Sequence, residues 1–303
     1  IRGGISTISH RYAKANNPMM PDYDPQVPHS YLWYCDANNL YGWAMSQYLP
    51  TGNFRFLTKE EISRFNVFNV ADNSNIGYAV ECDLEYPDHL HDLHADYPLA
   101  AESLLITEEI LSPYCVSFGR KHTDSTKLTP NLRNKTKYVT HYRNLKLYIR
   151  LGMRVTKIHR VMSFTQSAWI KPFVDFNTLK RQEAKTKVDQ DRYKLIVNSF
   201  FGKTCENKRR RKHIQLVSDP TKMKKLVAKP QLEQFRIINE NCVLVDRVRQ
   251  KVKLDKPIYT GFAILELSKL HMHQFHYDVI KKRYGENARL LFTDTDSLAY
   301  EIR

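Results

Sequence analysis

The chain has 303 residues, of which 42% are hydrophobic and 12% aromatic, so it can bury a sizeable core and hold two or more subdomains. Its formal net charge of +15 indicates a polyanionic partner. No apolar run reaches membrane-spanning length, no signal peptide begins the chain, and five scattered cysteines indicate reduced, buried thiols, so we expect an intracellular protein that is neither secreted nor membrane-bound, with nucleus or cytoplasm left open.

The first predicted elements surround Asp36. The aromatic-rich run 31–35 predicts a buried strand, and Asp36 stands at its end. The turn formers 37–39 follow, and residues 40–45 then have a helical pattern. An aspartate in this place can bind a metal ion or simply cap the turn, and the second role is the more common one.

The long middle of the chain carries little chemical signal. Residues 66–75 are polar and predict a surface loop, and residues 76–84 predict a strand. Three histidines follow with two aspartates nearby, but neither a cysteine pair nor a closing histidine pair stands at zinc-finger spacing. A structural or surface role is therefore favoured for this group, which comprises Asp88, His89, His91, Asp92 and His94.

Residues 175–202 predict a largely helical, strongly basic stretch that ends at Gly202. Four of its side chains recur at spacings of seven, four and three residues and so share one helix face: Lys187, Lys194, Asn198 and Phe201. A cation, an amide and an aromatic ring on a common face suit a phosphate, a polar base edge and a stacked base. The other cations nearby are interpreted as solvated surface charges: Lys180, Lys185 and Arg192.

Two further features precede the end of the chain. The charge block Lys208, Arg209, Arg210, Arg211 and Lys212 could be a nuclear-import signal, a loop that grips duplex DNA, or a solvated surface. Residues 261–284 predict a helix that ends at Gly285, with one apolar stripe of Leu265, Met272, Phe275 and Val279. This helix would pack beneath the sheet that carries the final hairpin.

The run Thr-Asp-Thr-Asp-Ser at 293–297 places Asp294 and Asp296 two residues apart in a tight bend. Apolar residues 290–292 precede the bend, and residues 298–302 alternate apolar and polar as a strand does. Carboxylates this close repel each other, and a bound divalent cation reverses that cost. If Asp36 lies nearby in the sheet, the three carboxylates could hold two metal ions about 3.5–4 Å apart, as in-line phosphoryl transfer requires.

The three segments together resemble the conserved motifs of family B DNA polymerases. Asp36–Gly42 (DANNLYG) is similar to motif A, DxxSLYP; residues 194–202 (KLIVNSFFG) are similar to motif B, KxxxNSxYG; and residues 292–297 (FTDTDS) are similar to motif C, YxDTDS. They occur in the family's order. The NNLYG variant and the Gly3-Gly4 pair are closer to the protein-primed branch, which includes polymerases of viruses and of virus-like mobile elements. That branch has a YxGG motif, and here Ile1 stands where its Tyr would be.

The chain departs from these motifs at a few positions. Asn39 replaces a Ser, Gly42 replaces a Pro, and Phe201 and Phe292 replace two Tyr. None of these changes removes a carboxylate or the motif B lysine. The two phenylalanines keep the aromatic ring and lose only its hydroxyl, so stacking is retained.

The resemblance implies an α+β fold, with an antiparallel-sheet polymerase palm, helical fingers and a subdomain inserted between motifs A and B. We expect the first part of the palm at 1–60, an insertion resembling the terminal-protein region at 61–165, and the fingers at 166–203. Residues 204–303 would hold a second insertion, the palm helix and the motif C hairpin. An exonuclease domain would precede Ile1 and a thumb would follow motif C, so the chain is expected to be a fragment.

The same resemblance implies a DNA-directed DNA polymerase that adds deoxynucleotides to a primer 3′-hydroxyl, with protein priming. Asp36, Asp294 and Asp296 would be catalytic, and Asp36, Asp296 and the Ala37 carbonyl would hold two Mg²⁺ ions, with Mn²⁺ as an alternative. The deoxynucleoside triphosphate would contact Asn39, Leu40, Tyr41, Lys187, Lys194, Asn198 and Phe201, with the Tyr41 ring rejecting a ribose 2′-hydroxyl. The primer–template would contact Gly3, Gly4, Ser297 and the block of Lys208, Arg209, Arg210, Arg211 and Lys212. A terminal priming protein is the further partner expected.

Two other readings stay open. A polymerase of a mobile element could persist as a non-catalytic DNA-binding relic, although the carboxylates and Lys194 are intact. A reverse transcriptase would carry adjacent Asp-Asp at its hairpin, where this chain has Asp-Thr-Asp-Ser, and would lack the Lys-x-x-x-Asn-Ser helix.

Overall fold

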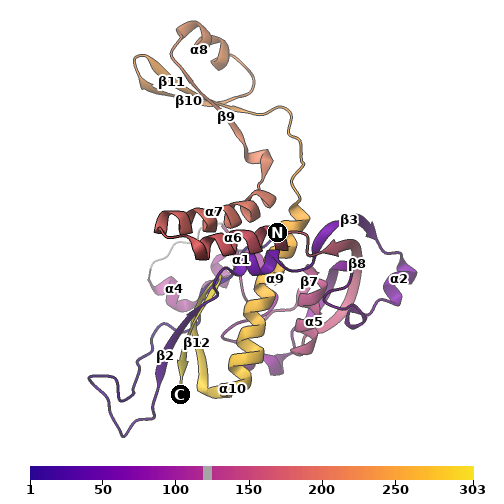
Figure 1. Ribbon diagram of the computed structural model, residues 1–303, viewed down its shortest axis with the longest axis vertical. Coiled ribbons are helices and arrows are strands. Elements are labelled where there is room, and N and C mark those ends of the chain that lie inside the picture. The colour runs from indigo at the N-terminus through magenta and orange to yellow at the C-terminus, as the bar shows by residue number, and fades with distance from the viewer. Residues whose placement is uncertain (119–124) are drawn as a thin grey trace. The chain divides into compact units, whose positions relative to one another are not determined.

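Helices and antiparallel sheets make up the chain, whose computed structural model describes residues 1–118 and 125–303 (Figure 1). These residues fall into two units, one made of Ile1–Phe201 with Tyr259–Arg303 and the other of Gly202–Ile258. The strands pair in antiparallel fashion throughout the described sheets. The predicted α+β class with antiparallel sheets is therefore confirmed.

The predicted terminal hairpin is part of a four-stranded sheet with the order β1-β12-β13-β2, which we call the hairpin sheet. β12 (Ala288–Asp294) and β13 (Ser297–Ile302) form the hairpin, and Thr295 and Asp296 make its turn. β1 (Ser6–Ile8) pairs with β12, and β2 (Tyr31–Asp36) pairs with β13. Strands from both ends of the chain thus meet in one sheet.

The prediction that residues 31–35 form a buried strand is only half right. The strand is present, but the side chains of Tyr31–Tyr34 are between 41% and 59% exposed. β2 is the last strand in the order of its sheet, so one of its edges has no partner strand there. An edge strand that is rich in aromatic residues has the same sequence pattern as a buried strand, so the pattern does not reveal the exposure. Its rings pack beside those of neighbouring elements, Trp33 on Tyr300 at 6.2 Å and Tyr34 against Phe292 at 6.1 Å between ring centroids.

The predicted palm helix is α9 (Ile258–Gln274), which continues through a π-helical turn (Phe275–Lys281) into α10 (Lys282–Tyr284). It ends at Gly285, whose φ of 53° suits glycine. Met272 and Ile280 pack against Leu290 and Leu298 of the hairpin sheet, as predicted (Figure 1). The prediction of a single apolar stripe is wrong. Helix α9 is buried on most sides, whereas Val279 is 50% exposed, because it lies within the π turn, where the 3.6-residue periodicity is interrupted.

The segment between motifs A and B builds a second four-stranded sheet with the order β3-β8-β4-β7. Residues 76–84 form β4, as predicted, and Val80, Leu84, Tyr142, Leu145 and Val161 fill the core beside it. The elements of this segment are β3 (Leu49–Phe56), α2 (Lys59–Ser63), β4 (Ile76–Glu85), α3 (His91–His94), β5 (Glu102–Leu105), α4 (Pro113–Ser117), β6 (Thr126–Thr129), β7 (Lys135–His141), α5 (Tyr142–Arg150) and β8 (Arg154–Ser167).

The basic stretch forms two helices, α6 (Lys171–Glu183) and α7 (Lys187–Thr204), where the sequence predicted one long helical segment. The Thr186 hydroxyl accepts a hydrogen bond from the Asp189 N–H at 3.1 Å, which fixes the start of α7. Gly202 lies inside α7, so the predicted helix end at this glycine is wrong. Val174 of α6 and Val197 of α7 share a core with Ala44 of α1 (Leu40–Met45) and with Ile264 of α9.

The smaller unit folds around its own core of Val217, Leu226 and Val245. Its sheet has the order β10-β11-β9, built from β9 (Lys212–Val217), β10 (Leu232–Asn239) and β11 (Cys242–Val248). Helix α8 (Pro220–Val227) begins at Asp219, whose carboxylate accepts from the Thr221 N–H at 2.8 Å.

Two predictions from composition concern the chain as a whole. Of the cysteines, Cys82 is buried as predicted, whereas the others are half-buried: Cys35, Cys115, Cys205 and Cys242. Among residues 1–118 and 125–303, no helix is long and apolar enough to cross a membrane.

Candidate active site

The predicted carboxylates lie together at one end of the hairpin sheet. Asp36, the last residue of β2, stands opposite Ser297, and Ser297 stands opposite Asp294, the last residue of β12. Residues directly opposite each other in antiparallel strands share a face and have Cα atoms about 4.5–5.5 Å apart. Asp296 lies in the turn between them, and its carbonyl accepts from the Ala37 N–H at 2.7 Å. The structure therefore joins the end of β2 to the hairpin turn, as the sequence predicted.

The carboxylates at this end of the sheet repel one another. The pKa of Asp296 is raised above its usual value, first by burial and next by the negative charge of Asp36. Asp294 raises it further, whereas the ammonium of Lys194 lowers it. Two carboxylates and a lysine from far apart in the sequence are thus close enough to influence one another. A cation bound between the carboxylates would remove the repulsion.

Oxygen donors at this place fit a hard divalent cation. Asp36 and Asp296 carry carboxylates, and Ala37, whose N–H bonds to the Asp296 carbonyl, follows Asp36 directly. Carboxylates and backbone carbonyls are ligands that Mg²⁺ prefers. Within the described part of the chain, no group of three or more His, Cys, Asp or Glu side chains is arranged to hold a metal ion. Asp36 and Asp296 are the two carboxylates that the structure joins at this turn, and Asp294, the last residue of β12, is exposed.

The turn after Asp36 depends on two residues that depart from motif A. Asn39 has a left-handed backbone with φ of 59°, which asparagine tolerates better than most residues, and it precedes the first residue of α1. Its side chain lies over Gly42, so that a Cβ at position 42 would be 2.1 Å from Asn39 Nδ2. Any larger residue at 42, proline included, would collide with the amide. The two departures are therefore structurally linked.

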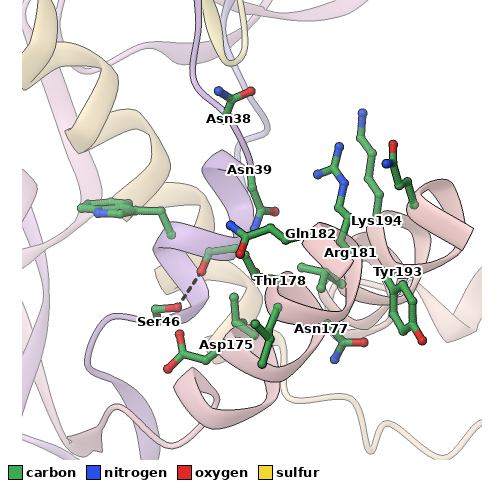
Figure 2. A pocket seen from close by; sticks show the side chains of 16 residues that line it. Asn38, Asn39, Ser46, Asp175, Asn177, Thr178, Arg181, Gln182, Tyr193 and Lys194 are labelled. Carbon is green, nitrogen blue, oxygen red and sulfur yellow. Dashed lines mark hydrogen bonds between the residues drawn. The ribbon is translucent and has the colours of Figure 1, made fainter. Parts of the chain in front are cut away.

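A cavity of about 730 Å³ opens between this turn and the two basic helices (Figure 2). Asn38 and Asn39 line it from the motif A side, and Arg181 and Lys194 extend from α6 and α7 in the same direction. The other lining residues are Gly42, Trp43, Ser46, Val174, Asp175, Asn177, Thr178, Leu179, Gln182, Gln190, Tyr193 and Val197. Two cations that face amide groups across an open cavity can hold a phosphate-bearing ligand.

The structure brings some of the predicted nucleotide-binding residues to this cavity. Asn39 and Lys194 line it, and the ring of Tyr41 stacks on that of Phe201 with centroids 4.4 Å apart and planes at 19°. The other five predicted residues do not occur among the described lining residues: Leu40, Tyr41, Lys187, Asn198 and Phe201. Leu40 is buried in the core under the hairpin sheet, Asn198 is half-buried, and Lys187 pairs with Asp191 at 3.4 Å.

Sequence reasoning missed the other cation of the cavity, Arg181, and its neighbour Gln182. In the sequence, the positive charge of residues 175–202 was the only indication of Arg181. Spacing along α7 cannot show which residues of α6 face the cavity. The face of α7 that lines the cavity carries Gln190, Tyr193, Lys194 and Val197, so it is rotated from the predicted face and shares Lys194 with it.

The predicted DNA contacts are spread over both units. Ser297 is 3% exposed, and its hydroxyl donates to the Asp294 carbonyl at 3.3 Å. Gly4 lies against Thr295, whereas an added Cβ at Gly3 would meet no described atom within 4 Å. In the charge block, Lys208 pairs with Asp255 at 2.6 Å, Arg211 pairs with Glu206 at 2.6 Å, and Lys212 pairs with Asp246 at 3.0 Å. Among the described residues, Arg209 and Arg210 form no ion pair.

Comparisons with known proteins agree with the motifs. Residues 26–282 match the sequence model of a family described as DNA polymerase type B, organellar and viral. Among solved structures, the chain is similar to Phi29 DNA polymerase complexed with primer–template DNA, at 14% identity and a TM-score of 0.50, over 98% of this chain and 40% of that one. It is also similar to Phi29 DNA polymerase complexed with primer–template DNA and incoming nucleotide substrates, at 16% identity and a TM-score of 0.49, over 98% and 41%.

The extent of these matches limits what they show. The chain spans about two fifths of the length of the polymerase chains it resembles, since the matches cover 40% and 41% of those chains. At such low identities the first likeness shows a shared fold alone. No curated protein sequence matches the chain.

Proposed function

Because the chain belongs to the organellar and viral type B DNA polymerases, we propose that it is a polymerase catalytic core that extends a primer 3′-hydroxyl with deoxynucleotides chosen by a template. Membership of family B, which the three motifs predicted, is thereby confirmed. The observation that supports the proposed activity best is the meeting of Asp36 and Asp296 at the hairpin turn, within electrostatic reach of Lys194. Acidic and basic groups so placed suit phosphoryl transfer.

Divalent metal use is general in DNA polymerases, and the donor set at the hairpin fits it. In this proposal Asp36, Asp296 and the Ala37 carbonyl hold two Mg²⁺ ions, for which Mn²⁺ can substitute. Bound there, the ions would lower the pKa of the primer hydroxyl and neutralise the triphosphate and the leaving pyrophosphate. Asp294, exposed beside them, would adjust the negative charge of the site without being a ligand.

The cavity of Figure 2 would receive the triphosphate of the incoming nucleotide. Lys194 supplies a mobile point charge, and Arg181 can offer two parallel N–H donors to phosphate oxygens. Backbone N–H groups of Asn39, Leu40 and Tyr41 would add donors on the opposite side. Lys187 would contribute less, because it is exposed and paired with Asp191.

The stacked rings of Tyr41 and Phe201 would form the wall next to the sugar and the base. On the motif resemblance, the Tyr41 ring would clash with a ribose 2′-hydroxyl and so would select deoxynucleotides. Asn198 and Phe201 would lie along the nascent base pair. The protein would then read the shape of the pair, while base pairing with the template reads the sequence.

Primer–template DNA is the proposed polyanionic partner. Gly3, Gly4 and Ser297 would approach the primer end, and the block 208–212 would contact the backbone from the smaller unit, which is rich in lysine and arginine. The motif resemblance supports three further proposals about organisation: a terminal priming protein contacts residues 61–165, the fingers lie at 166–203, and a second insertion follows them. It also supports a mobile-element origin and an intracellular site of action.

A magnesium-dependent primer-extension assay on DNA and RNA templates tests the proposal. Asp36→Ala and Asp296→Ala should each abolish incorporation and leave primer–template affinity within about threefold of the wild type. Asp92→Ala, an exposed aspartate on α3, is the matched control and should extend primers normally.

Other outcomes separate the rival readings. DNA binding by a wild-type chain that extends no primer would identify a relic. Preference for an RNA template would favour a reverse transcriptase. Normal synthesis by either aspartate variant would refute the metal assignment.

A further inference from the structure

The turn that carries Asp296 has an unfavourable backbone. Thr295 has φ of 60°, in the left-handed region that β-branched residues rarely adopt. Such a conformation persists only where its surroundings fix it. Two contacts from the start of the chain do so here: the Thr295 N–H donates to the Ile5 carbonyl at 2.8 Å, and Ser6 of β1 stands opposite Asp294 of β12.

Gly4 lets this segment lie directly on the turn. A Cβ added at Gly4 would be 2.5 Å from Thr295 Cγ2 and 2.6 Å from its Oγ1, both closer than real Cβ contacts allow. At Gly3, in contrast, an added Cβ would meet no described atom within 4 Å. The absence of a side chain is therefore required at one glycine of the pair and not at the other.

A buried charge cluster holds the same segment at its other end. Glu266 of α9 is 1% exposed and pairs with Lys269 at 2.9 Å and with Arg2 at 3.8 Å. Lys269 also donates to the Arg2 carbonyl at 3.1 Å, and the Arg2 guanidinium lies 3.8 Å from the ring centroid of Tyr138. These contacts hold Arg2 against α9 and against Tyr138 of β7.

We propose that residues 2–6 are a strap that positions the Thr295–Asp296 turn and thereby holds Asp296 beside Asp36. Gly4, Arg2 and Glu266 are positioning residues in this view, because they act on the carboxylates through the turn. The consequence for catalysis rests on the function proposed above, whereas the mechanical link between Gly4 and Thr295 does not. Gly4 thus has a role inside the protein in addition to the proposed DNA contact.

Hydrogen–deuterium exchange in the full 303-residue chain tests the mechanical link without reference to activity. Gly4→Ala should speed exchange of the Thr295 amide by about tenfold or more, because its bond to Ile5 is broken. Gly3→Ala is the matched control and should leave this exchange unchanged. Amides of β4 and β8 report whether the fold as a whole has opened.

A second-site variant keeps the test decisive even if Gly4→Ala unfolds the chain. Thr295→Gly removes the side chain that the new methyl group would strike and also suits the left-handed backbone. The double variant Gly4→Ala/Thr295→Gly should therefore regain the slow exchange of the wild type. Equal exchange in Gly4→Ala and Gly3→Ala, or failure of the double variant to recover, would overturn the strap.

Manganese binding, followed by electron paramagnetic resonance, connects the strap to the carboxylates. Gly4→Ala should weaken Mn²⁺ affinity by about tenfold, and Thr295→Gly in the same chain should restore it. Unchanged Mn²⁺ affinity in Gly4→Ala would overturn the claim that the strap positions Asp296. A wild-type chain that binds no Mn²⁺ would refute the proposed metal site, while the exchange result would still decide on the strap.

Discussion

Three buried histidines should make the larger unit sensitive to mild acid. His94, His273 and His276 are each at most 1% exposed and lie among tyrosines under the hairpin sheet. Burial lowers the pKa of His94 and of His273 to about 4 and that of His276 to about 3. The positive charges of Lys269 and Lys281 act on the last two in the same direction.

The sign and size of the effect follow from these values. An unfolded histidine binds its proton near pH 6.5, whereas the folded ones stay neutral until about pH 4 or below, so acid favours the unfolded chain over that interval. At about pH 5 each histidine removes about 2 kcal/mol, since one pH unit corresponds to about 1.4 kcal/mol, so the three together remove about 6 kcal/mol. His141, which is also fully buried and whose pKa burial lowers to about 3, adds a similar loss in the same unit. A typical domain is stable by only about 5–15 kcal/mol.

The buried carboxylate Glu266 does not contribute to the loss of stability over this pH interval. Burial by itself raises the pKa of Glu266, but its cations and hydrogen bonds more than offset this and hold the value at about 2, against an ordinary 4.5. A depressed carboxylate stabilises the fold above its ordinary pKa and withdraws that stability only as the pH falls below about 4.5. Losses above that pH therefore belong to the histidines.

Urea denaturation followed by tryptophan fluorescence between about pH 7.5 and about pH 5 measures the loss. His273→Phe keeps a ring stacked on Tyr97, now 4.5 Å from the imidazole, and removes one proton site. This variant should retain about 2 kcal/mol at about pH 5 that the wild type loses. His89→Gln, on the surface, should leave the pH dependence unchanged. A wild-type stability that is flat over this interval, or a slope unaltered by His273→Phe, would refute the reasoning.

Four further outcomes test the site. Gly42→Pro should abolish incorporation through collision with Asn39, and Asn39→Ser in the same chain should recover much of it; additive losses would contradict the link. Tyr41→Ala should accept ribonucleotides about tenfold more readily or better, and unchanged sugar selection would remove its role as a gate. Arg181→Ala and Lys194→Ala should each raise the KM for deoxynucleotides about tenfold with DNA affinity intact, and an unchanged KM would exclude the cavity. Primer–template affinity should fall steeply with salt, so a flat response would argue against backbone contacts.

Local patterns predicted the elements that hold the carboxylates. Alternation of apolar and polar residues around the aspartates identified the hairpin, and the aromatic-rich run 31–35 identified the strand that ends at Asp36. The palm helix was predicted because its apolar residues and its final Gly285 are both local signals. Each of these inferences needs only neighbours within one segment, and the structure confirms them.

Tertiary packing decided what the sequence could not show. Aromatic residues in β2 look the same whether the strand is central or at an edge, so its exposure was not predictable. The π turn after Gln274 changes the facing of Val279 without any proline or glycine to announce it. Arg181 reaches the cavity only because α6 packs beside α7, and no spacing along one helix contains that information.

The departures from motif A now look like one structural change and not two. Asn39 places an amide in the space that a side chain at 42 would fill, so a chain with asparagine here must carry glycine there. The same logic applies across 291 positions of sequence, where Gly4 accepts the side chain of Thr295. In both cases a residue with a left-handed backbone lies against a glycine whose Cβ would collide with its side chain, once in the turn after Asp36 and once beside Asp296. The two matched contacts therefore lie at the two turns that carry Asp36 and Asp296, the carboxylates proposed above as metal ligands.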